Sequence, residues 1–331
     1  MDGLSAGVTV IVPVWNGREL LVKLLASLRT QTHPVIEILA IDNGSEDGAA
    51  AEAEREGARV IRLGTNLGFS RAVNRGIKES RTEWLAIVNT DVELSPDWLE
   101  KLMGAVGPRV WFATGKILAA SRREILDGTY DAVCRGGCAW RVGHGRPDSP
   151  EFSQSSSIDF APLTAALFRA QLFQDVGPLE ERFESYLEDI DLGLRCAAAG
   201  YRGVYVPAAV AYHRGSAALG RWHPETVRRI SRNQLLLVAK HYPTALLFRY
   251  AWCILVAQGL WGFLATRNGT GWAFVQGKLQ GVRMFGSMRA CSAGLREILE
   301  RSERDILQVQ QRTGFDLYWR LYFLLTARGV F

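Results

Sequence analysis

The sequence predicts an α/β fold, a mostly parallel sheet followed by a helical C-terminal extension. Apolar strand-like runs alternate with helical patterns over residues 8–88. The length of 331 residues suits one large α/β domain with an appendage. Beyond residue 231 the alternation ends and long apolar stretches begin. We therefore expect an α/β domain over residues 1–230 and a helical, amphipathic to apolar extension over 231–331.

The first half of the chain alternates regularly. Residues 8–14 form a continuous β-branched run, which is typical of a strand covered on both faces. Leucines at helical spacing then predict a helix over 18–29. Strands are expected next at 35–41, 59–63 and 84–88, and helices at 49–56 and about 70–80. Such alternation predicts parallel strands joined by right-handed crossovers.

The pattern is less regular after Asp91. Glycine and polar residues within 136–157 indicate loops. Regular structure is expected again at 165–173, in a helix entered at 188–191, and in a strand at 201–207. The five cysteines are an odd and scattered set, which argues against a disulfide framework.

Residues 245–265 are almost wholly apolar and about as long as a membrane span, which needs roughly 20 residues. Because the segment contains Arg249 and Gln258, a helix lying in the membrane interface fits better, and a core or homodimer helix and a true span are the alternatives. Basic residues prevail over 221–289, which suits an anionic membrane surface. We expect no secretory leader, a cytoplasmic protein peripheral on the inner face of the cell membrane, and no nucleic-acid partner.

Two acidic clusters about a hundred residues apart carry the candidate chemistry. Asp91 follows the strand at 84–88, and its hard oxygen atoms suit Mg²⁺ or Mn²⁺, although a turn or helix cap is the alternative. Glu188, Asp189 and Asp191 stand at the start of a predicted helix, where the macrodipole favours acids. Three carboxylates within four residues exceed what capping needs. Their mutual repulsion raises a pKa, as a proton acceptor near neutral pH requires.

Other polar residues end neighbouring strands or open loops. Asp42 ends the second strand and could accept a hydrogen bond from the imide of a pyrimidine base, with an Asx turn as the alternative. Asn89 lies on the same side as Asp91 and could orient a phosphate or sugar. His213 is either a metal ligand or a structural histidine. The chain contains no Walker loop and no dinucleotide fingerprint, which argues against NTP hydrolysis and dinucleotide binding.

In combination, these segments resemble the family 2 glycosyltransferases with the GT-A fold, and among them the bacterial rhamnosyltransferase-like group. The resemblance covers roughly residues 8–216, in order and at suitable spacings. It implies a Rossmann-like nucleotide-diphospho-sugar transferase sheet. The tail resembles the membrane-associating ends of relatives that act on polyprenyl-linked glycans. The segments that carry the resemblance are 8–16, 41–45, 66–77, 89–91, 180–195, 200–201 and His213.

The resemblance also implies roles for individual residues. The reaction would be metal-dependent, inverting transfer from a dTDP- or UDP-sugar, first of all L-rhamnose, to a hydroxyl of a glycan or polyprenyl-linked acceptor in cell-surface polysaccharide synthesis. Asp189 would be the base, with Glu188 as the alternative, and Asp91 and His213 would hold Mg²⁺ or Mn²⁺. Thr164, Tyr186 and Asp191 would contact the acceptor or sugar. The nucleotide site would comprise Pro13, Val14, Trp15, Asn16, Asp42, Asn66, Gly68, Asn74 and Asn89.

Two other functions remain open at this point. A nucleotidyltransferase shares a similar sheet, but it normally needs a glycine-rich basic loop after the first strand, where this chain has Pro13-Val14-Trp15-Asn16-Gly17. A sugar-nucleotide-binding scaffold without catalysis would need no base. The chain also departs from the family pattern at 159–164, which lacks an expected glycine, and at 184–186, which is less aromatic than expected.

Overall fold

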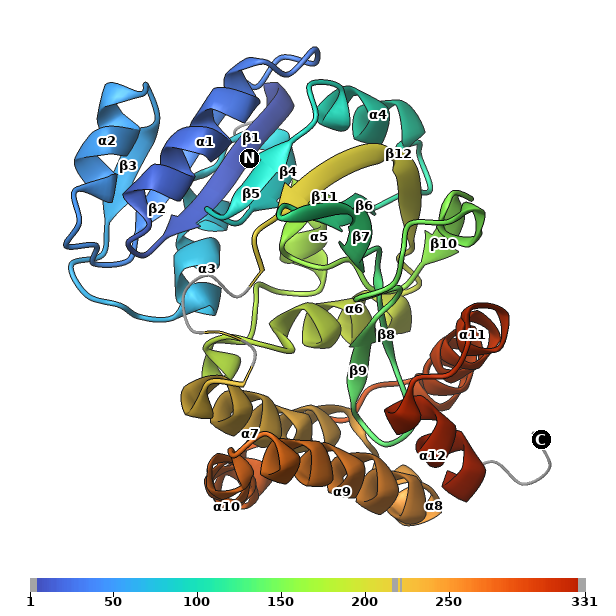
Figure 1. Cartoon of the computed structure of the whole chain (residues 1–331). Helices are drawn as coiled ribbons and strands as arrows, with labels where there is room; N and C mark the ends of the chain where they lie inside the picture. Colours follow the sequence, from blue (N-terminus) through green and yellow to red (C-terminus); the bar gives the residue numbers. More distant parts are fainter. Residues whose placement is uncertain (1–4, 216–219, 221, 327–331) are drawn as a thin grey trace.

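Residues 5–88 fold as the alternation predicts. The structure, a computed structural model, describes residues 5–215, 220 and 222–326 (Figure 1). Four parallel strands lie in the order β4, β1, β2, β3. The elements are β1 (Ser5–Val14), α1 (Arg18–Arg29), β2 (Glu37–Asp42), α2 (Ala49–Arg55), β3 (Arg59–Arg62), α3 (Phe69–Glu79) and β4 (Thr82–Val88).

Strand β1 is covered on both faces. Val10 and Val12 pack in one core cluster with the leucines of α1, and Ile11 packs in a second with Ala72 and Val73 of α3. All three β1 side chains are wholly buried. This burial explains the continuous β-branched run, since a strand with one solvated face would alternate apolar and polar residues.

The second half extends the same sheet with antiparallel pairs. Strand β11 lies antiparallel between β4 and β6, and β12 pairs with β6 in parallel. The sequence pattern did not predict β5, β6, β7 or β10. The added elements are β5 (Val92–Leu94), α4 (Trp98–Ala105), β6 (Phe112–Ala119), β7 (Arg122–Gly128), η1 (Pro150–Phe152), β10 (Ser156–Ile158), β11 (Ala165–Arg169), α5 (Ala170–Asp175), η2 (Glu181–Phe183), α6 (Glu188–Ala198) and β12 (Gly203–His213).

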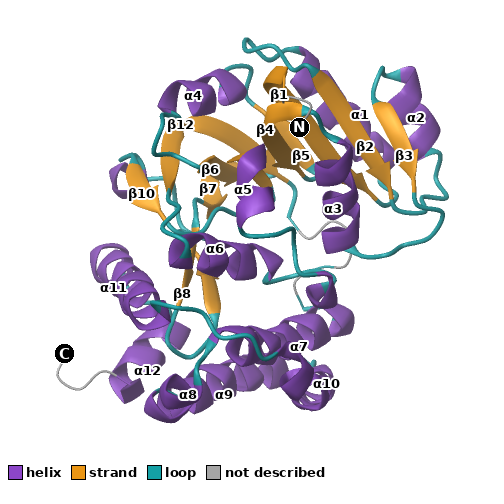
Figure 2. Cartoon of the chain, turned by 180° about the vertical axis from the view of Figure 1, so that it is seen from behind, coloured by secondary structure: helices purple, strands orange, loops and turns teal. Residues whose placement is uncertain are grey.

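A separate hairpin connects the sheet to the helices below it (Figure 2). Strands β8 (Asp131–Val133) and β9 (Ala139–Arg141) form this hairpin. Its tip has no room for side chains, because a Cβ on Gly136 would lie 2.3 Å from Ala257 Cβ and 2.6 Å from Cys253 O. The hairpin therefore packs tightly on the C-terminal helices.

The C-terminal part is helical, as predicted. Helices α7 and α10 pack so closely that a Cβ on Gly277 would lie 2.2 Å from Arg228 O. The apolar segment 245–265 is divided at Tyr250 into two helices. Among the described helices, none combines the length and the apolar character that a bilayer crossing requires. The helices are α7 (Pro224–His241), α8 (Thr244–Arg249), α9 (Ala251–Arg267), α10 (Gly271–Met288), α11 (Leu295–Thr313) and α12 (Leu317–Thr326).

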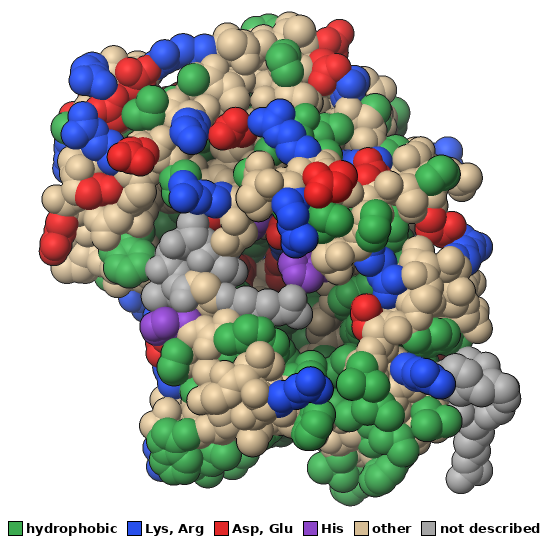
Figure 3. Space-filling view, in the orientation of Figure 1, with side chains coloured by type: hydrophobic (Ala, Val, Ile, Leu, Met, Phe, Trp, Pro, Cys, Tyr) green, Lys and Arg blue, Asp and Glu red, His purple; other side chains and the backbone are tan. Residues whose placement is uncertain are grey.

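Large apolar side chains are exposed on the C-terminal helices and gather at the lower end of the molecule (Figure 3). Phe248 is 80% exposed and Trp272 is 70% exposed. This surface, called the apolar end below, comprises Phe248, Trp252, Leu255, Phe263, Trp272, Leu279, Val282, Leu317, Leu324 and Leu325.

Candidate active site

Asp91 and His213 meet at the end of the sheet. Strand β5 pairs with β12 so that Val92 lies opposite His213, which places the preceding Asp91 beside the imidazole. Asp91 Oδ1 lies 3.2 Å from His213 Nε2. The other ring nitrogen, Nδ1, lies 2.8 Å from Oδ2 of Asp127, near the end of β7. The imidazole is thus held between two carboxylates.

These contacts shift the pKa values of His213 and Asp127. Burial disfavours the imidazolium form of His213, but hydrogen bonds to Asp127 and Asp91 outweigh burial and raise its pKa to about 9. Burial also opposes ionisation of Asp127, and the bond to His213 outweighs it and lowers the Asp127 pKa to about 2. At neutral pH the protein alone therefore holds a protonated imidazole against the Asp127 carboxylate at this position.

Arg141, the last residue of β9, links this group to the second acidic cluster. Its Nε donates to Asp131 Oδ1 at 3.1 Å, and its Nη1 donates to Thr164 Oγ1 at 3.0 Å. The guanidinium also lies 3.8 Å from Asp127 Oδ2 and 3.8 Å from Asp189 Oδ2. A continuous polar network therefore connects Asp91 with Asp189.

At the start of α6, Glu188 is buried and Asp189 is mostly buried, with 16% of its side chain exposed. Burial, followed by the charge of Asp131, raises the pKa of Asp189 to about 7, although Arg141 opposes this shift. Burial also raises the pKa of Glu188 well above its ordinary value. Glu188 Oε2 has no hydrogen-bond partner among the described residues. A carboxyl group with a pKa near neutrality can accept a proton at physiological pH.

The sequence analysis missed Asp127, Asp131 and Arg141. They lie in the region after Asp91 where no regular pattern was seen, and the strand pairings β6–β7 and β8–β9 bring them to the site. One local signal was present in Gly128, because a Cβ there would lie 2.1 Å from Arg141 Cγ. Glycine at this position leaves the space that the arginine side chain occupies.

The residues predicted to bind the nucleotide gather at the carboxyl ends of β1, β2 and β3. Trp15 follows β1 and is 43% exposed, whereas Val14 is buried and pairs with Asp42 in the sheet. Asn16 Oδ1 accepts a hydrogen bond from Glu46 N. Asp42 Oδ1 accepts one from Ser45 N at 2.9 Å, which is the Asx turn considered above.

A groove of about 1180 Å³ opens beside this edge. Asn66 holds one wall, since its Oδ1 accepts hydrogen bonds from Asn43 Nδ2 and Gly68 N, both at 3.0 Å. Helix α7 supplies the opposite wall. The residues lining the groove include Trp15, Asn66, Leu67, Gly68, Arg71, Asn74, Glu184, Arg229, Arg232 and Lys240.

The side-chain amides of Asn74 and Asn89 differ in their hydrogen bonds. Asn74 Nδ2 donates to Leu179 O at 2.9 Å and its Oδ1 accepts from Leu179 N at 2.8 Å, so the amide fastens a loop to α3. Asn74 was predicted to contact the nucleotide, whereas in this structure both ends of its amide bind the Leu179 backbone. Asn89 is held through its backbone, which donates to Thr164 O, and its buried Oδ1 has no partner among the described residues.

Two predicted acceptor residues face the C-terminal helices. The hydroxyl of Tyr186 lies 3.3 Å from Thr226 Oγ1 of α7. Asp191 has no exposed surface, and its Oδ1 lies 2.7 Å from Lys240 Nζ and 2.8 Å from His241 Nε2. The acceptor contact of Asp191 stays a prediction, and in this structure the carboxylate faces Lys240 and His241 of α7.

The two side chains predicted to bind a metal ion lie together in the structure. Asp91 and His213 present an oxygen and a nitrogen 3.2 Å apart. Among residues 5–215, 220 and 222–326, no group of three or more His, Cys, Asp or Glu side chains could hold a metal ion. The two side chains fit an ion that takes its remaining ligands from a bound diphosphate and water, as Mg²⁺ commonly does.

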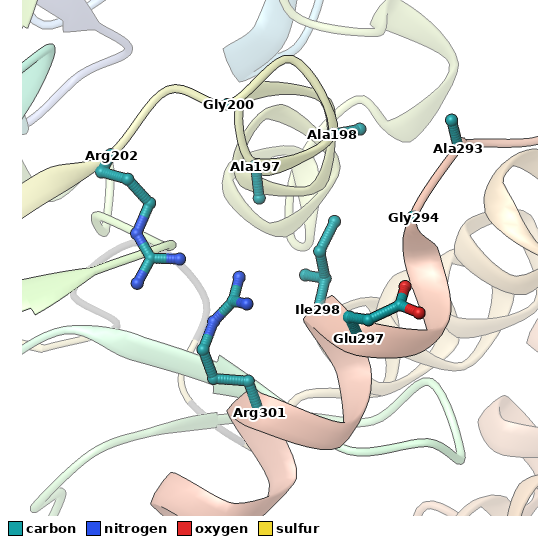
Figure 4. A pocket seen from close by; sticks show the side chains of 9 residues that line it. All are labelled: Ala197, Ala198, Gly200, Arg202, Ala293, Gly294, Glu297, Ile298 and Arg301. Carbon is teal, nitrogen blue, oxygen red and sulfur yellow. The ribbon is translucent and has the colours of Figure 1, made fainter.

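A second cavity, of about 420 Å³, lies between α6 and α11 (Figure 4). Arg202 and Arg301 point into it, and both pair with Asp159, at 2.8 and 2.9 Å. None of the predicted site residues lines this cavity. It is therefore separate from the network described above.

Comparison with known proteins identifies the family of this chain. Residues 9–177 match Glycosyl transferase family 2. The chain is 30% identical over 230 residues to N-acetylglucosaminyl-diphospho-decaprenol L-rhamnosyltransferase of Mycobacterium tuberculosis, covering 60% of this chain and 73% of the relative.

Two solved glycosyltransferases share the fold. GalNAc-T7, solved with UDP, GalNAc and Mn²⁺, superposes with a TM-score of 0.64 at 14% identity, over 95% of this chain and 59% of that enzyme. The mannosyltransferase PcManGT of Pyrobaculum calidifontis, solved with GDP-Man and Mn²⁺, superposes with a TM-score of 0.52 at 15% identity, over 97% and 88%. The predicted GT-A fold is thereby confirmed.

Proposed function

Because the chain belongs to glycosyl transferase family 2, we propose that it transfers a sugar from a nucleoside diphosphate donor to an acceptor hydroxyl with inversion. One observation carries this proposal: a single, mostly buried polar network joins Asp91, at the proposed donor side of the sheet, to Asp189 at the start of α6. Inverting transfer needs such a base on the acceptor side, opposite the leaving group.

In the proposed step, Asp189 takes the proton of the acceptor hydroxyl. The hydroxyl oxygen forms a bond to the anomeric carbon as the bond from that carbon to the diphosphate oxygen breaks, and the nucleoside diphosphate leaves. A pKa of about 7 matches this task, since the carboxylate is present at neutral pH and still accepts a proton. Arg141 orients the base and limits the rise of its pKa.

The proposed donor is a dTDP- or UDP-sugar, with L-rhamnose as the first sugar to test. The rhamnosyltransferase named above supports the sugar and a polyprenyl-diphosphate-linked glycan acceptor. The groove beside Trp15 and Gly68 would receive the nucleoside. Since Ser45 N occupies Oδ1 of Asp42, a base contact would fall on the second carboxylate oxygen.

The proposed cofactor is Mg²⁺ or Mn²⁺, and both solved neighbours contain Mn²⁺. Asp91 and His213 would hold the ion beside the donor diphosphate. When bound, the ion would neutralise charge on the leaving diphosphate. Only a neutral imidazole can be a ligand, so ion binding would release the proton that Asp91 and Asp127 hold on His213.

The apolar end would rest on the membrane surface that carries the acceptor. Aromatic and aliphatic side chains exposed on neighbouring helices suit the boundary between headgroups and acyl chains. Replacing Phe248 and Trp252 by serine should reduce cosedimentation of the full chain with vesicles of anionic lipid, because roughly 2 kcal/mol per large side chain is lost. Equal cosedimentation of this variant and the wild type would refute membrane attachment through this surface.

Calorimetric titration with UDP and dTDP, with and without Mn²⁺, tests the site. We expect metal-dependent binding that is lost in Asp91→Ala, and the preferred nucleotide narrows the donor. Transfer from the matching nucleotide sugar should then require Asp189. Nucleotide binding that depends on neither metal nor Asp91 would contradict the proposed metal site. Donor binding without transfer to any lipid-linked glycan would contradict the proposed transfer reaction.

A further inference from the structure

The segment that precedes the candidate base has an unusual backbone. Glu184, Tyr186 and Leu187 have φ angles of 61°, 73° and 69°, which non-glycine residues rarely adopt. Leu187 is the N-cap of α6, and its carbonyl accepts a hydrogen bond from Asp191 N. The conformation of residues 184–187 therefore determines where α6 begins, at Glu188, one residue before Asp189. Such conformations persist only where surrounding contacts hold them.

Two neighbouring residues of α7 supply those contacts. Asn233, which has no exposed surface, places its Nδ2 within hydrogen-bond distance of the carbonyls of Phe183, Ser185 and Tyr186, at 2.9, 2.9 and 2.7 Å. Its Oδ1 accepts a hydrogen bond from Arg232 Nε at 2.9 Å, and Arg232 Nη2 donates to Phe183 O at 2.8 Å. Asn233 therefore holds the segment directly through Nδ2. Through Oδ1 it orients Arg232, which contacts the same segment.

The other side of the segment contacts the donor groove. Ser70 N at the start of α3 donates to Glu184 O at 3.0 Å. A Cβ on Gly68 would lie 3.3 Å from the same carbonyl oxygen, so the two chains are in close contact. Residues 184–187 thus lie between α7 and the edge that carries the predicted nucleotide residues.

We propose that Asn233 is a positioning residue for glycosyl transfer, because it fixes the left-handed segment that places Asp189 against Arg141. The inference rests on the proposed function, since Asp189 must be the base. Helix α6 has a second anchor on α7, where Asp191 in its first turn pairs with Lys240 and His241. Loss of Asn233 therefore releases residues 183–187, which precede Asp189, while the helix stays attached through Asp191.

The test compares Asn233→Ala and Asn233→Ser with Ser302→Ala as a matched control. Ser302 accepts a buried hydrogen bond from Val133 N at 2.8 Å on the β8–β9 hairpin, outside the segment before α6. All variants are first checked by thermal denaturation and by calorimetric binding of UDP or dTDP. Transfer rates are then measured against acceptor concentration and pH.

We expect Asn233→Ala to lower kcat on the order of 100-fold, as displacement of a reacting group by about 1 Å does, with donor affinity unchanged within about threefold. The half-maximal rate should move to lower pH, because a released Asp189 gains water and its pKa falls. Asn233→Ser, which keeps one donor, should be intermediate. Ser302→Ala should lose stability but keep kcat within about twofold.

The outcomes separate this inference from the proposed function. An Asn233→Ala enzyme with wild-type kcat and pH profile overturns the positioning role, and so does a loss of kcat no larger than that of Ser302→Ala at equal loss of Tm. If Asn233→Ala does not fold, Asn233→Ser decides by the same criteria. Full transfer by Asp189→Asn overturns the proposed function and the inference with it.

Discussion

Replacing Asp189 by Asn should stabilise the protein at alkaline pH while abolishing transfer. Asparagine resembles the protonated carboxyl group in shape and can still donate a hydrogen bond to Asp131. Since the folded state raises the pKa of Asp189 to about 7, mainly through burial, folding disfavours the charged form. The amide removes that cost together with the base.

The size of the effect follows from the shift in pKa. The folded pKa of about 7 lies about three above the ordinary aspartate pKa of 3.8, and a tenfold change in proton affinity corresponds to about 1.4 kcal/mol. The folded state therefore binds more protons than the unfolded state between these two values, and stability falls as pH rises through that window. The cost of Asp189 approaches about 4 kcal/mol at pH 8 and is below about 2 kcal/mol at pH 5.

Urea denaturation of wild type and Asp189→Asn at about pH 5 and about pH 8 measures this difference. The variant should be more stable at both values, with the larger gain at the higher pH. Asp127→Asn is the matched control of opposite sign, because the pKa of Asp127 is lowered to about 2 by His213. That variant should lose stability at neutral pH. A pH-independent difference for Asp189→Asn, or a loss of stability at pH 8, would refute the reasoning.

Three further predictions concern neighbouring residues. Arg141→Met should move the half-maximal transfer rate to higher pH, because Arg141 holds down the pKa of Asp189; an unchanged pH profile would contradict this. Asp191→Asn should reduce the free energy of unfolding by about 3 kcal/mol in urea denaturation, since Lys240 and the buried His241 lose their carboxylate partner; donor affinity should not change. Gly277→Ala should cost about 1–3 kcal/mol, measured in the same way, because the methyl group meets the α7 backbone; a neutral effect would show that α10 shifts freely.

The sequence predicts the first half of the fold well because local pattern and final environment agree there. Strand β1 is buried on both faces by α1 and α3, and its β-branched run reflects that environment directly. Strand β7 differs from β1, since its first three residues are exposed and its pairing with β6 is irregular. A strand of this kind shows neither alternation nor a continuous apolar run.

The candidate site was predictable where a residue follows a recognisable strand or opens a helix, as Asp91 and Asp189 do. Asp127 and Arg141 were not, because long-range pairing alone brings them beside His213 and Asp189. Asp191 has the same residue type and the same neighbourhood in sequence as Asp189. Asp191 differs in pairing with Arg195 of its own helix and with Lys240 and His241 of α7, and no local pattern reports the packing of α7.

Because α7 contacts the segment before α6, it limits where the chain can be truncated or joined to another protein. A chain shortened at residue 230 would lose Asn233 and Lys240, and with them contacts on both sides of Asp189. A chimera that exchanges α8–α12 should therefore be joined after His241, where α7 ends. Over evolutionary time the same constraint would allow α8–α12 to diverge freely, while α7 changes only together with the α/β domain.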